Sequence, residues 1–215
     1  MRGAARTCFR HPTRVSPERM RIGARLRDRS LHLVLDRAYY STSGAGFRTA
    51  NGVSQAGQTK RSGDDMPTDE DYMRMAIEEA RAAARKGEVP VGAVVVRGGK
   101  VLARAHNMRE TMADPTAHAE ILALRQAAEK RGTWRLEGVT VYCSLEPCAM
   151  CAGALVNARV DRLVFGPTDE KSGACGTVVN LLDQPAFNHR VDVRGGVLEE
   201  EALEVLQQFF REKRD

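Results

Sequence analysis

Two short motifs hold the residues of this chain that could do chemistry. Residues 118–120 read His-Ala-Glu, and residues 147–151 read Pro-Cys-Ala-Met-Cys. Imidazole and thiolate groups are common zinc ligands, and a catalytic zinc ion keeps a fourth position open for water beside three protein ligands. His118, Cys148 and Cys151 would supply those three ligands. Glu120 would stay outside the coordination shell and carry protons.

The same residues have less specific interpretations. A lone C-x-x-C motif also occurs in redox proteins and as half of a structural zinc ribbon, and a lone histidine on a helix is more often a core residue than a ligand. A ribbon needs a second C-x-x-C motif, and the other cysteines, Cys8, Cys143 and Cys175, are isolated. The joint occurrence of both motifs therefore favours a hydrolytic zinc site.

Two predicted helices would hold the motifs together. The residues with helical spacing after position 116 are Ile121, Leu122, Leu124 and Ala128. This spacing predicts a helix from Thr116, with the His-x-Glu motif in its first turn. Pro147 precedes an apolar run at 149–158, and proline is favoured at a helix start. A zinc ion would lie between two helix N-termini, whose partial positive charge favours thiolate over thiol.

Strands and helices alternate along the rest of the chain. We expect helices from Thr68 to Gly87 and at 118–130, 149–158 and 199–211, and strands at 89–96, 101–105, 139–143, 162–165 and 191–193. Thr68 and Asp71 are spaced as a capping pair, and two glycines at 98–99 predict a hairpin. An initial hairpin followed by this alternation predicts a mixed α/β sheet covered on both faces.

The motifs also carry a resemblance to a known family. The pair H-x-E and P-C-x-x-C is the signature of zinc-dependent nucleobase deaminases, among them the tRNA adenosine deaminases. The similarity extends to residues 88–94, Asn107, 114–121, 145–154 and 188–191. From about Met66 to the C-terminus, the chain resembles the bacterial-type tRNA-specific adenosine deaminase family of the cytidine deaminase superfamily. The resemblance implies a cytidine deaminase-like three-layer α/β/α sandwich with a mixed central sheet.

An activity follows from the resemblance. It implies hydrolytic deamination of the wobble adenosine (position 34) of the tRNA anticodon to inosine by a zinc-activated hydroxide. It implies one Zn²⁺ ion per subunit, recognition of the tRNA anticodon stem-loop, a homodimer and a cytoplasmic location. The small apolar residues at 150–155 would suit the close packing of two subunits.

Residue roles carry over position by position. His118, Cys148 and Cys151 match the zinc ligands, and Glu120 matches the proton shuttle. The positions that match substrate contacts are Asn107 for the flipped base, Val89 for a wall of its pocket, the backbone of Ala119 and Pro147, and Asp169, Lys171 and Phe210 for the RNA. Asn107 could instead cap its own turn, Val89 could be a core strand residue, and either Phe209 or Phe210 could belong to the core. Thr168 stands where relatives commonly have a basic residue.

Two rival functions remain open. A deaminase of a free base or nucleotide, such as guanine, cytosine or dCMP, would use the same zinc ligands and Glu120. The segment 114–121 and the Phe-Phe-Arg sequence at 209–211 favour tRNA over these substrates. A non-catalytic zinc subunit that helps a partner bind tRNA is the second rival. Such subunits typically lose the shuttle carboxylate, and this chain has Glu120.

Charge is divided unevenly along the 215 residues. Residues 1–65 contain 13 Lys and Arg and 5 Asp and Glu, a net charge of +8, whereas the whole chain carries +5, so residues 66–215 carry −3. The pI of about 9.1 is therefore a property of the leading segment and does not argue for RNA binding by the deaminase domain at 66–215. No apolar stretch is long enough to predict a membrane helix or a secretory signal.

The segment 1–65 has three interpretations. Its composition predicts a basic, disordered extension. An over-extended start codon is favoured, because Met66 leads directly into a capped helix. An organelle presequence, which would send the protein to a mitochondrion or plastid, is the alternative suggested by its Arg-rich, acid-poor start. A basic RNA-binding arm ranks last, because no aromatic residues are interleaved with the arginines for stacking on RNA.

Overall fold

Five strands form one mixed sheet within residues 66–214, the part of the chain that this computed structural model describes. The strands are β1 (Gly92–Arg97), β2 (Lys100–His106), β3 (Val139–Cys143), β4 (Arg162–Phe165) and β5 (Asp192–Arg194), in the order β2-β1-β3-β4-β5. β1 pairs antiparallel with β2 and β3, whereas β3, β4 and β5 run parallel. The three interpretations of residues 1–65 lie outside the described residues.

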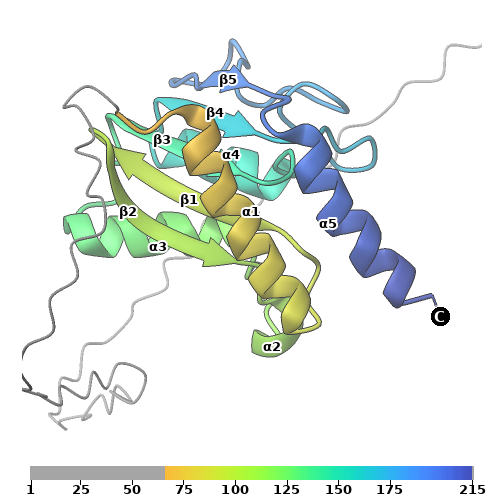
Figure 1. Ribbon diagram of the computed structural model, residues 1–215. Coiled ribbons are helices and arrows are strands. Elements are labelled where there is room, and N and C mark those ends of the chain that lie inside the picture. Colours follow the sequence, from red (N-terminus) through yellow and green to blue (C-terminus); the bar gives the residue numbers. More distant parts are fainter. Residues whose placement is uncertain (1–65, 215) are drawn as a thin grey trace, which may run out of the picture. The chain divides into compact units, whose positions relative to one another are not determined.

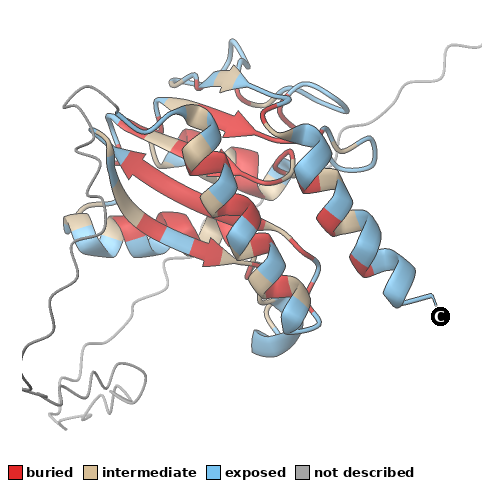
Figure 2. Cartoon of the chain, viewed as in Figure 1, coloured by how far each residue is buried: buried red, intermediate tan, exposed pale blue. Residues whose placement is uncertain are grey.

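Helices cover both faces of this sheet. α1 (Asp69–Arg85) and α5 (Glu199–Glu212) lie on one face, and α3 (Ala119–Arg131) and α4 (Ala149–Asn157) lie on the other (Figure 1). Alternate residues of β1 serve the two cores: Ala93 and Val95 pack on the α3 and α4 side, and Val94 and Val96 on the α1 side. Figure 2 shows β1 buried while the helices are buried on one side only. The predicted three-layer sandwich with a mixed central sheet is confirmed.

The start of α1 confirms the predicted capping pair. The Thr68 N–H donates to Asp71 Oδ2 at 2.9 Å, and the Asp71 N–H donates to Thr68 Oγ1 at 3.3 Å. Each side chain thereby satisfies a backbone N–H that has no partner within the helix. Within residues 66–214, no helix has the length and apolar character needed to cross a membrane.

Asp69, in the first turn of α1, ties this helix to the sheet. Its carboxylate accepts hydrogen bonds from Arg162 at 2.9 Å, from Arg194 at 2.6 Å and from the Tyr142 hydroxyl at 2.9 Å. Burial raises the pKa of Asp69, but these three donors outweigh burial and lower the pKa below its ordinary value. The carboxylate therefore joins α1 to β3, β4 and β5 at once.

β1 begins at Gly92, three residues later than the sequence predicts. Pro90 cannot donate to a strand ladder, so the segment before Gly92 leaves the sheet. At Gly92 the strand passes so close to α1 that a Cβ atom would overlap the carbonyl oxygen of Ala76. Val89 therefore lies in the connection after α1, is 36 % exposed and is not a core strand residue.

The segment that leads into α3 also differs from the prediction. α3 begins at Ala119 and not at Thr116, because Asp114 accepts the Thr116 N–H at 2.7 Å and holds an Asx turn there. A four-residue helix, α2 (Arg109–Met112), precedes this turn and was not predicted. His118 is consequently the extended N-cap residue of α3 and not a member of its first turn.

Candidate active site

Three side chains that could hold a metal ion meet at the N-termini of α3 and α4. His118 is the N-cap of α3, Cys148 is the N-cap of α4, and Cys151 lies in the first turn of α4. His118 Nδ1 lies 3.7 Å from Cys148 Sγ and 3.6 Å from Cys151 Sγ. Tetrahedral zinc, with bonds of about 2.0–2.1 Å to nitrogen and 2.3 Å to sulfur, would separate such atoms by roughly 3.6 Å. This donor set fits Zn²⁺ with one coordination position left open.

Cys148 is the more readily ionised of the two thiols. The Cys151 thiol donates to it and His118 lies beside it, so the pKa of Cys148 falls to about 4 although burial opposes the shift. The hydrogen bond that the Cys151 thiol donates to Cys148, together with burial, raises the pKa of Cys151. A dication between the two sulfurs would make both of them thiolates, because a coordinating thiol loses its proton.

Glu120 places a free carboxylate oxygen beside these ligands. Its residue is only 3 % exposed, and its Oε2 has no hydrogen-bond partner among the described residues. Buried polar atoms without a partner are rare, so this oxygen requires an explanation. Burial raises the pKa of the carboxyl above its usual range. A buried carboxyl that faces a cavity and holds a proton easily is suited to passing protons to a substrate.

A cavity of about 150 Å³ opens onto this group. Seven of the residues singled out from the sequence line it: Val89, Asn107, His118, Ala119, Glu120, Cys148 and Asp169. Ala119 opens α3, where backbone N–H groups have no partner within the helix and can donate to a ligand. Asp169 accepts the N–H groups of Lys171 at 2.9 Å and Ser172 at 3.3 Å, so its carboxylate also shapes its own loop.

Asn107 is buried at the cavity and contacts a second buried carboxylate. Its Nδ2 donates to Glu88 Oε2 at 3.5 Å, and Glu88 also accepts the N–H groups of Glu110 at 3.1 Å and Thr111 at 2.7 Å. A carboxylate only accepts, so the amide nitrogen of Asn107 faces Glu88 and its Oδ1 is left for the cavity. Burial raises the pKa of Glu88, but these backbone donors outweigh burial and lower it.

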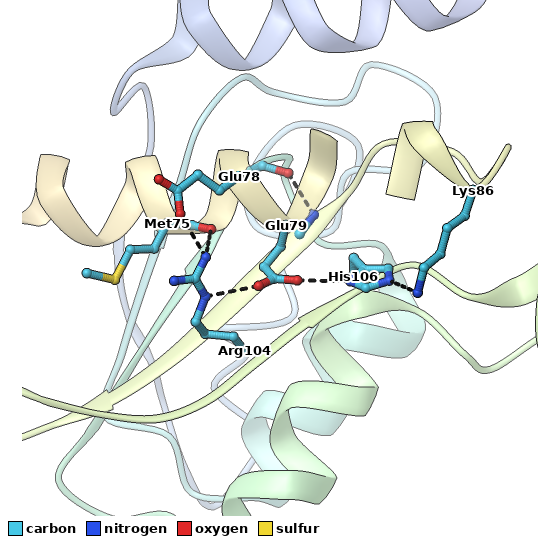
Figure 3. A network of polar contacts seen from close by, with 8 residues as sticks. Met75, Glu78, Glu79, Lys86, Arg104 and His106 are labelled. Carbon is cyan, nitrogen blue, oxygen red and sulfur yellow. Dashed lines mark hydrogen bonds and ion pairs between the residues drawn. The ribbon is translucent and has the colours of Figure 1, made fainter. Parts of the chain in front are cut away.

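A charged network fixes β2, the strand that ends at His106 directly before Asn107 (Figure 3). Arg104 of β2 donates to Glu78 and Glu79 of α1, each at 2.9 Å. His106 lies between Glu79 at 2.9 Å and Lys86 at 3.0 Å. Because the carboxylate only accepts and the ammonium only donates, a neutral His106 with its proton on Nδ1 satisfies both. The end of β2 is thus fastened to both the middle and the end of α1.

Three predicted contact residues do not line the cavity. Pro147 is buried, and its carbonyl oxygen accepts the Ala174 N–H at 2.9 Å. Lys171 is exposed on the loop beside Asp169. Phe210 lies on α5 and is 47 % exposed, in contrast to its neighbour Phe209, which is buried in the core at 7 %. The alternative that one of these two rings belongs to the core is therefore correct for Phe209 and wrong for Phe210.

Sequence reasoning missed several residues of the site. The cavity lining also includes Arg109, Leu145, Glu146 and Ser172. Glu88 lies outside the lining and accepts a hydrogen bond from Asn107, which is part of it. The sequence held one clue to Glu88 and Glu146, because each directly precedes a residue that was predicted to contact the substrate. Nothing in the sequence marks them as buried, because glutamate is usually a surface residue.

Fold and site together define the class of this protein, a hydrolytic deaminase with the cytidine deaminase-like fold. A family model described as MafB19-like deaminase matches residues 68–214. The tRNA-specific adenosine deaminase of Bacillus subtilis (strain 168) is 55 % identical over 149 residues, which are 69 % of this chain and 92 % of that protein. The chain belongs to the tRNA-specific adenosine deaminase family. Other members of this superfamily use zinc, as the His-Cys-Cys group here would.

Further relatives agree with this assignment. The tRNA-specific adenosine deaminase of Aquifex aeolicus (strain VF5) is 45 % identical over 67 % of this chain and 95 % of its own length. A solved structure from a study of A-to-I editing by tRNA:A34 deaminases superposes with a TM-score of 0.61 at 45 % identity, over 63 % of this chain and 98 % of that one. A guanine deaminase from Nitrosomonas europaea is more distant, with a TM-score of 0.56 and 26 % identity over 65 % and 83 % of the two chains.

Proposed function

We propose that this chain converts the wobble adenosine (position 34) of a tRNA anticodon to inosine, with a zinc ion held by His118, Cys148 and Cys151. The single observation that carries the chemistry is the three-ligand group at 3.6–3.7 Å beside the unpartnered oxygen of buried Glu120. The choice of adenosine in tRNA is supported by relatives of that name at 45–55 % identity.

The chain's own residues would divide the work as follows. Zinc, when bound, would lower the pKa of water towards 7 and so make hydroxide available at neutral pH. Glu120 would take the proton released by that water and deliver it to N1 of adenine as the hydroxide adds to C6. It would then move the proton of the new C6 hydroxyl to the exocyclic amine, so that the C6–N bond breaks, ammonia leaves and the C6 carbonyl of inosine forms. The unpartnered Oε2 and the raised pKa of Glu120 suit both directions of transfer.

Binding of the base would use the other residues of the cavity. Asn107 presents its Oδ1 to the base because Glu88 occupies its amide nitrogen. The Ala119 N–H would donate to the base from the start of α3, and Val89 would pack against the ring. The predicted contact of the Pro147 backbone has no support in this geometry, because its carbonyl oxygen lies outside the cavity lining and already accepts the Ala174 N–H at 2.9 Å and the Cys175 thiol at 3.7 Å.

The RNA itself would be held outside the cavity. A splayed anticodon loop offers an unstacked base, which costs less to flip than a paired one. Lys171, exposed beside Asp169, would contact phosphate, and the exposed ring of Phe210 would contact a nucleotide. Two chains would form a homodimer through the small residues of α4, among which Gly153 has no atom within 4 Å of its Cβ direction. A cytoplasmic location is expected. The alternative is a mitochondrion or plastid if residues 1–65 are a presequence, and a chloroplastic relative in Arabidopsis thaliana supports the plastid.

The decisive experiment is an inosine assay on an anticodon stem-loop RNA, with the zinc-loaded full chain and its Glu120→Ala variant. The wild type should form inosine at position 34. Glu120→Ala should lose roughly 10²- to 10⁴-fold in kcat, because only proton transfer is removed, while zinc content and RNA affinity stay unchanged. Guanine, cytosine and dCMP are offered in parallel. Turnover of one of these without inosine in the RNA would replace the proposal by a free-base or nucleotide deaminase, and normal turnover by Glu120→Ala would refute the mechanism.

A further inference from the structure

Glu146 is a buried carboxylate whose charge meets only neutral donors. Its residue is 2 % exposed. Oε1 accepts the N–H groups of Cys175 at 3.0 Å and Thr177 at 3.2 Å, and Oε2 accepts the Asp169 N–H at 3.0 Å and the Thr177 hydroxyl at 2.6 Å. No Lys, Arg or His within residues 66–214 forms an ion pair with it. Both oxygens are thus saturated by donors that hold no charge.

All four donors belong to one loop, residues 166–177, which follows β4. Asp169 and Ser172 of this loop line the cavity. The same loop is fastened to the start of α4, since the Ala174 N–H donates to the Pro147 carbonyl at 2.9 Å and Gly173 forms a β-bridge with Cys148. The loop therefore touches the substrate cavity on one side and a metal-binding residue on the other.

The backbone of the loop comes very close to this carboxylate at Gly173. A Cβ atom at Gly173 would overlap Glu146 Oε2 and the Asp169 carbonyl oxygen. Glycine is the residue that permits such a close approach of backbone to another group. Residues 169–177 are accordingly wrapped around the two oxygens of Glu146, and their position depends on where those oxygens lie.

An apolar side chain could fill this space at lower cost than an uncompensated buried charge. A carboxylate also fixes the orientation of the loop, because four donors must point at its two oxygens. We propose that Glu146 is a positioning residue that holds the 166–177 loop in place against the substrate, and so sets the affinity for the RNA and not the rate of the chemical step. Glu146 also borders the cavity, but both of its oxygens are occupied by loop donors, so it would act on the substrate through Asp169 and Ser172. The kinetic part of this proposal rests on the proposed deaminase function, whereas the structural part is independent of it.

The structural part is tested by amide hydrogen exchange on zinc-loaded full chains of wild type, Glu146→Gln and Asp69→Asn. Gln brings an N–H₂ group to face donors, so exchange of peptides within 166–177 should accelerate at least tenfold in Glu146→Gln. Peptides of α1 and α3 should keep their wild-type rates. Asp69→Asn, which weakens the opposite face of the sheet, should leave the loop unchanged. Equal acceleration everywhere in Glu146→Gln would mean a merely structural role and would overturn the proposal.

The kinetic part separates binding from chemistry. Glu146→Gln should keep wild-type zinc content, raise KM for the stem-loop RNA about tenfold and hold kcat within about threefold, because loop contacts are lost while Glu120 and the ligands remain. A fall in kcat at unchanged KM would contradict the proposal. If the wild type forms no inosine, the proposed function fails, yet the exchange result still decides whether Glu146 orders the loop.

Thr177→Val provides a milder variant in case Glu146→Gln does not fold. It removes only the hydroxyl donor at 2.6 Å and keeps the shape of the side chain. Exchange in 166–177 and KM should change in the same direction as in Glu146→Gln and by a smaller factor. Wild-type exchange of the loop in Thr177→Val, together with wild-type KM, would count against Glu146 as its anchor.

Discussion

At the scale of single residues, the two thiols at the start of α4 differ from the other buried cysteines in having a histidine beside them. Cys148→Ala should bind less than a tenth of the zinc of wild type and should be less stable, because one of three protein ligands is gone. Cys143→Ala, which removes a buried sulfur from β3, is the matched control and should keep its zinc. Elemental analysis and thermal unfolding with and without chelator check both. Full zinc loading in Cys148→Ala would exclude this ligand set.

The same scale shows which site residues a sequence can reveal. His118, Cys148 and Cys151 were predictable because imidazole and thiol groups at such spacing have few other uses, and the structure brings them together. Glu88 and Glu146 were not predictable. Their partners are backbone N–H groups 22 to 31 residues away in the chain, and any residue type except proline supplies such a donor. Whether such a glutamate is buried depends on backbone groups far away in the sequence. The residues next to it therefore show no pattern that predicts its burial.

At the scale of helices and strands, Asp69 makes the packing of α1 against the sheet depend on pH. Its pKa is lowered in the folded chain from an ordinary value of 3.8, so its contribution to stability is complete above about pH 4 and is lost as the pH falls through the lower folded value. Asp69→Asn should therefore cost about 2 kcal/mol at pH 7. The difference from wild type should shrink below pH 4. Urea unfolding at several pH values measures it, and a difference that grew on acidification would contradict this assignment.

The close passage of β1 under α1 gives a second prediction at this scale. Gly92→Ala should lower the free energy of unfolding by about 1–3 kcal/mol, because the new methyl group meets backbone and not a flexible side chain. Gly153→Ala, in α4, meets no atom of its own chain, so at concentrations where the proposed dimer dissociates it should leave stability unchanged or raise it by up to about 1 kcal/mol. Denaturant unfolding of both variants makes the comparison. Equal effects of the two variants would show that the close contact between Gly92 and α1 does not decide stability.

Element types were easier to predict than element ends. The hydrophobic spacing identified α1, α3, α4, α5 and all five strands. The start of β1 was predicted too early because Pro90 cannot donate to a strand ladder, and the start of α3 because an Asx turn at Asp114 competes with the helix. α2 has only four residues and none of them is buried, so it had no apolar pattern to detect.

At the scale of the whole molecule, charge separates the leading segment from the deaminase domain. Residues 1–65 carry +8 and residues 66–215 carry −3. At low salt, the full chain should bind RNA more tightly than residues 66–215 alone, and the difference should vanish as salt rises, because each neutralised phosphate releases counterions. The kcat of the two chains should agree. Filter binding across a salt series tests the affinity, and a salt-independent difference would point to specific contacts by the segment.

The ligand positions also bear on how long a chain survives in the cell. His118 and Cys148 are 30 residues apart, and the intervening segment contains α3 and β3. A metal ion that joins them is a cross-link, and closing a loop of that length would reduce the entropy of the unfolded chain by the equivalent of roughly 3–4 kcal/mol. Chains made under zinc starvation would lack this cross-link and would unfold more often, so that proteases would degrade them. Zinc supply would then govern the abundance of the enzyme as well as its turnover.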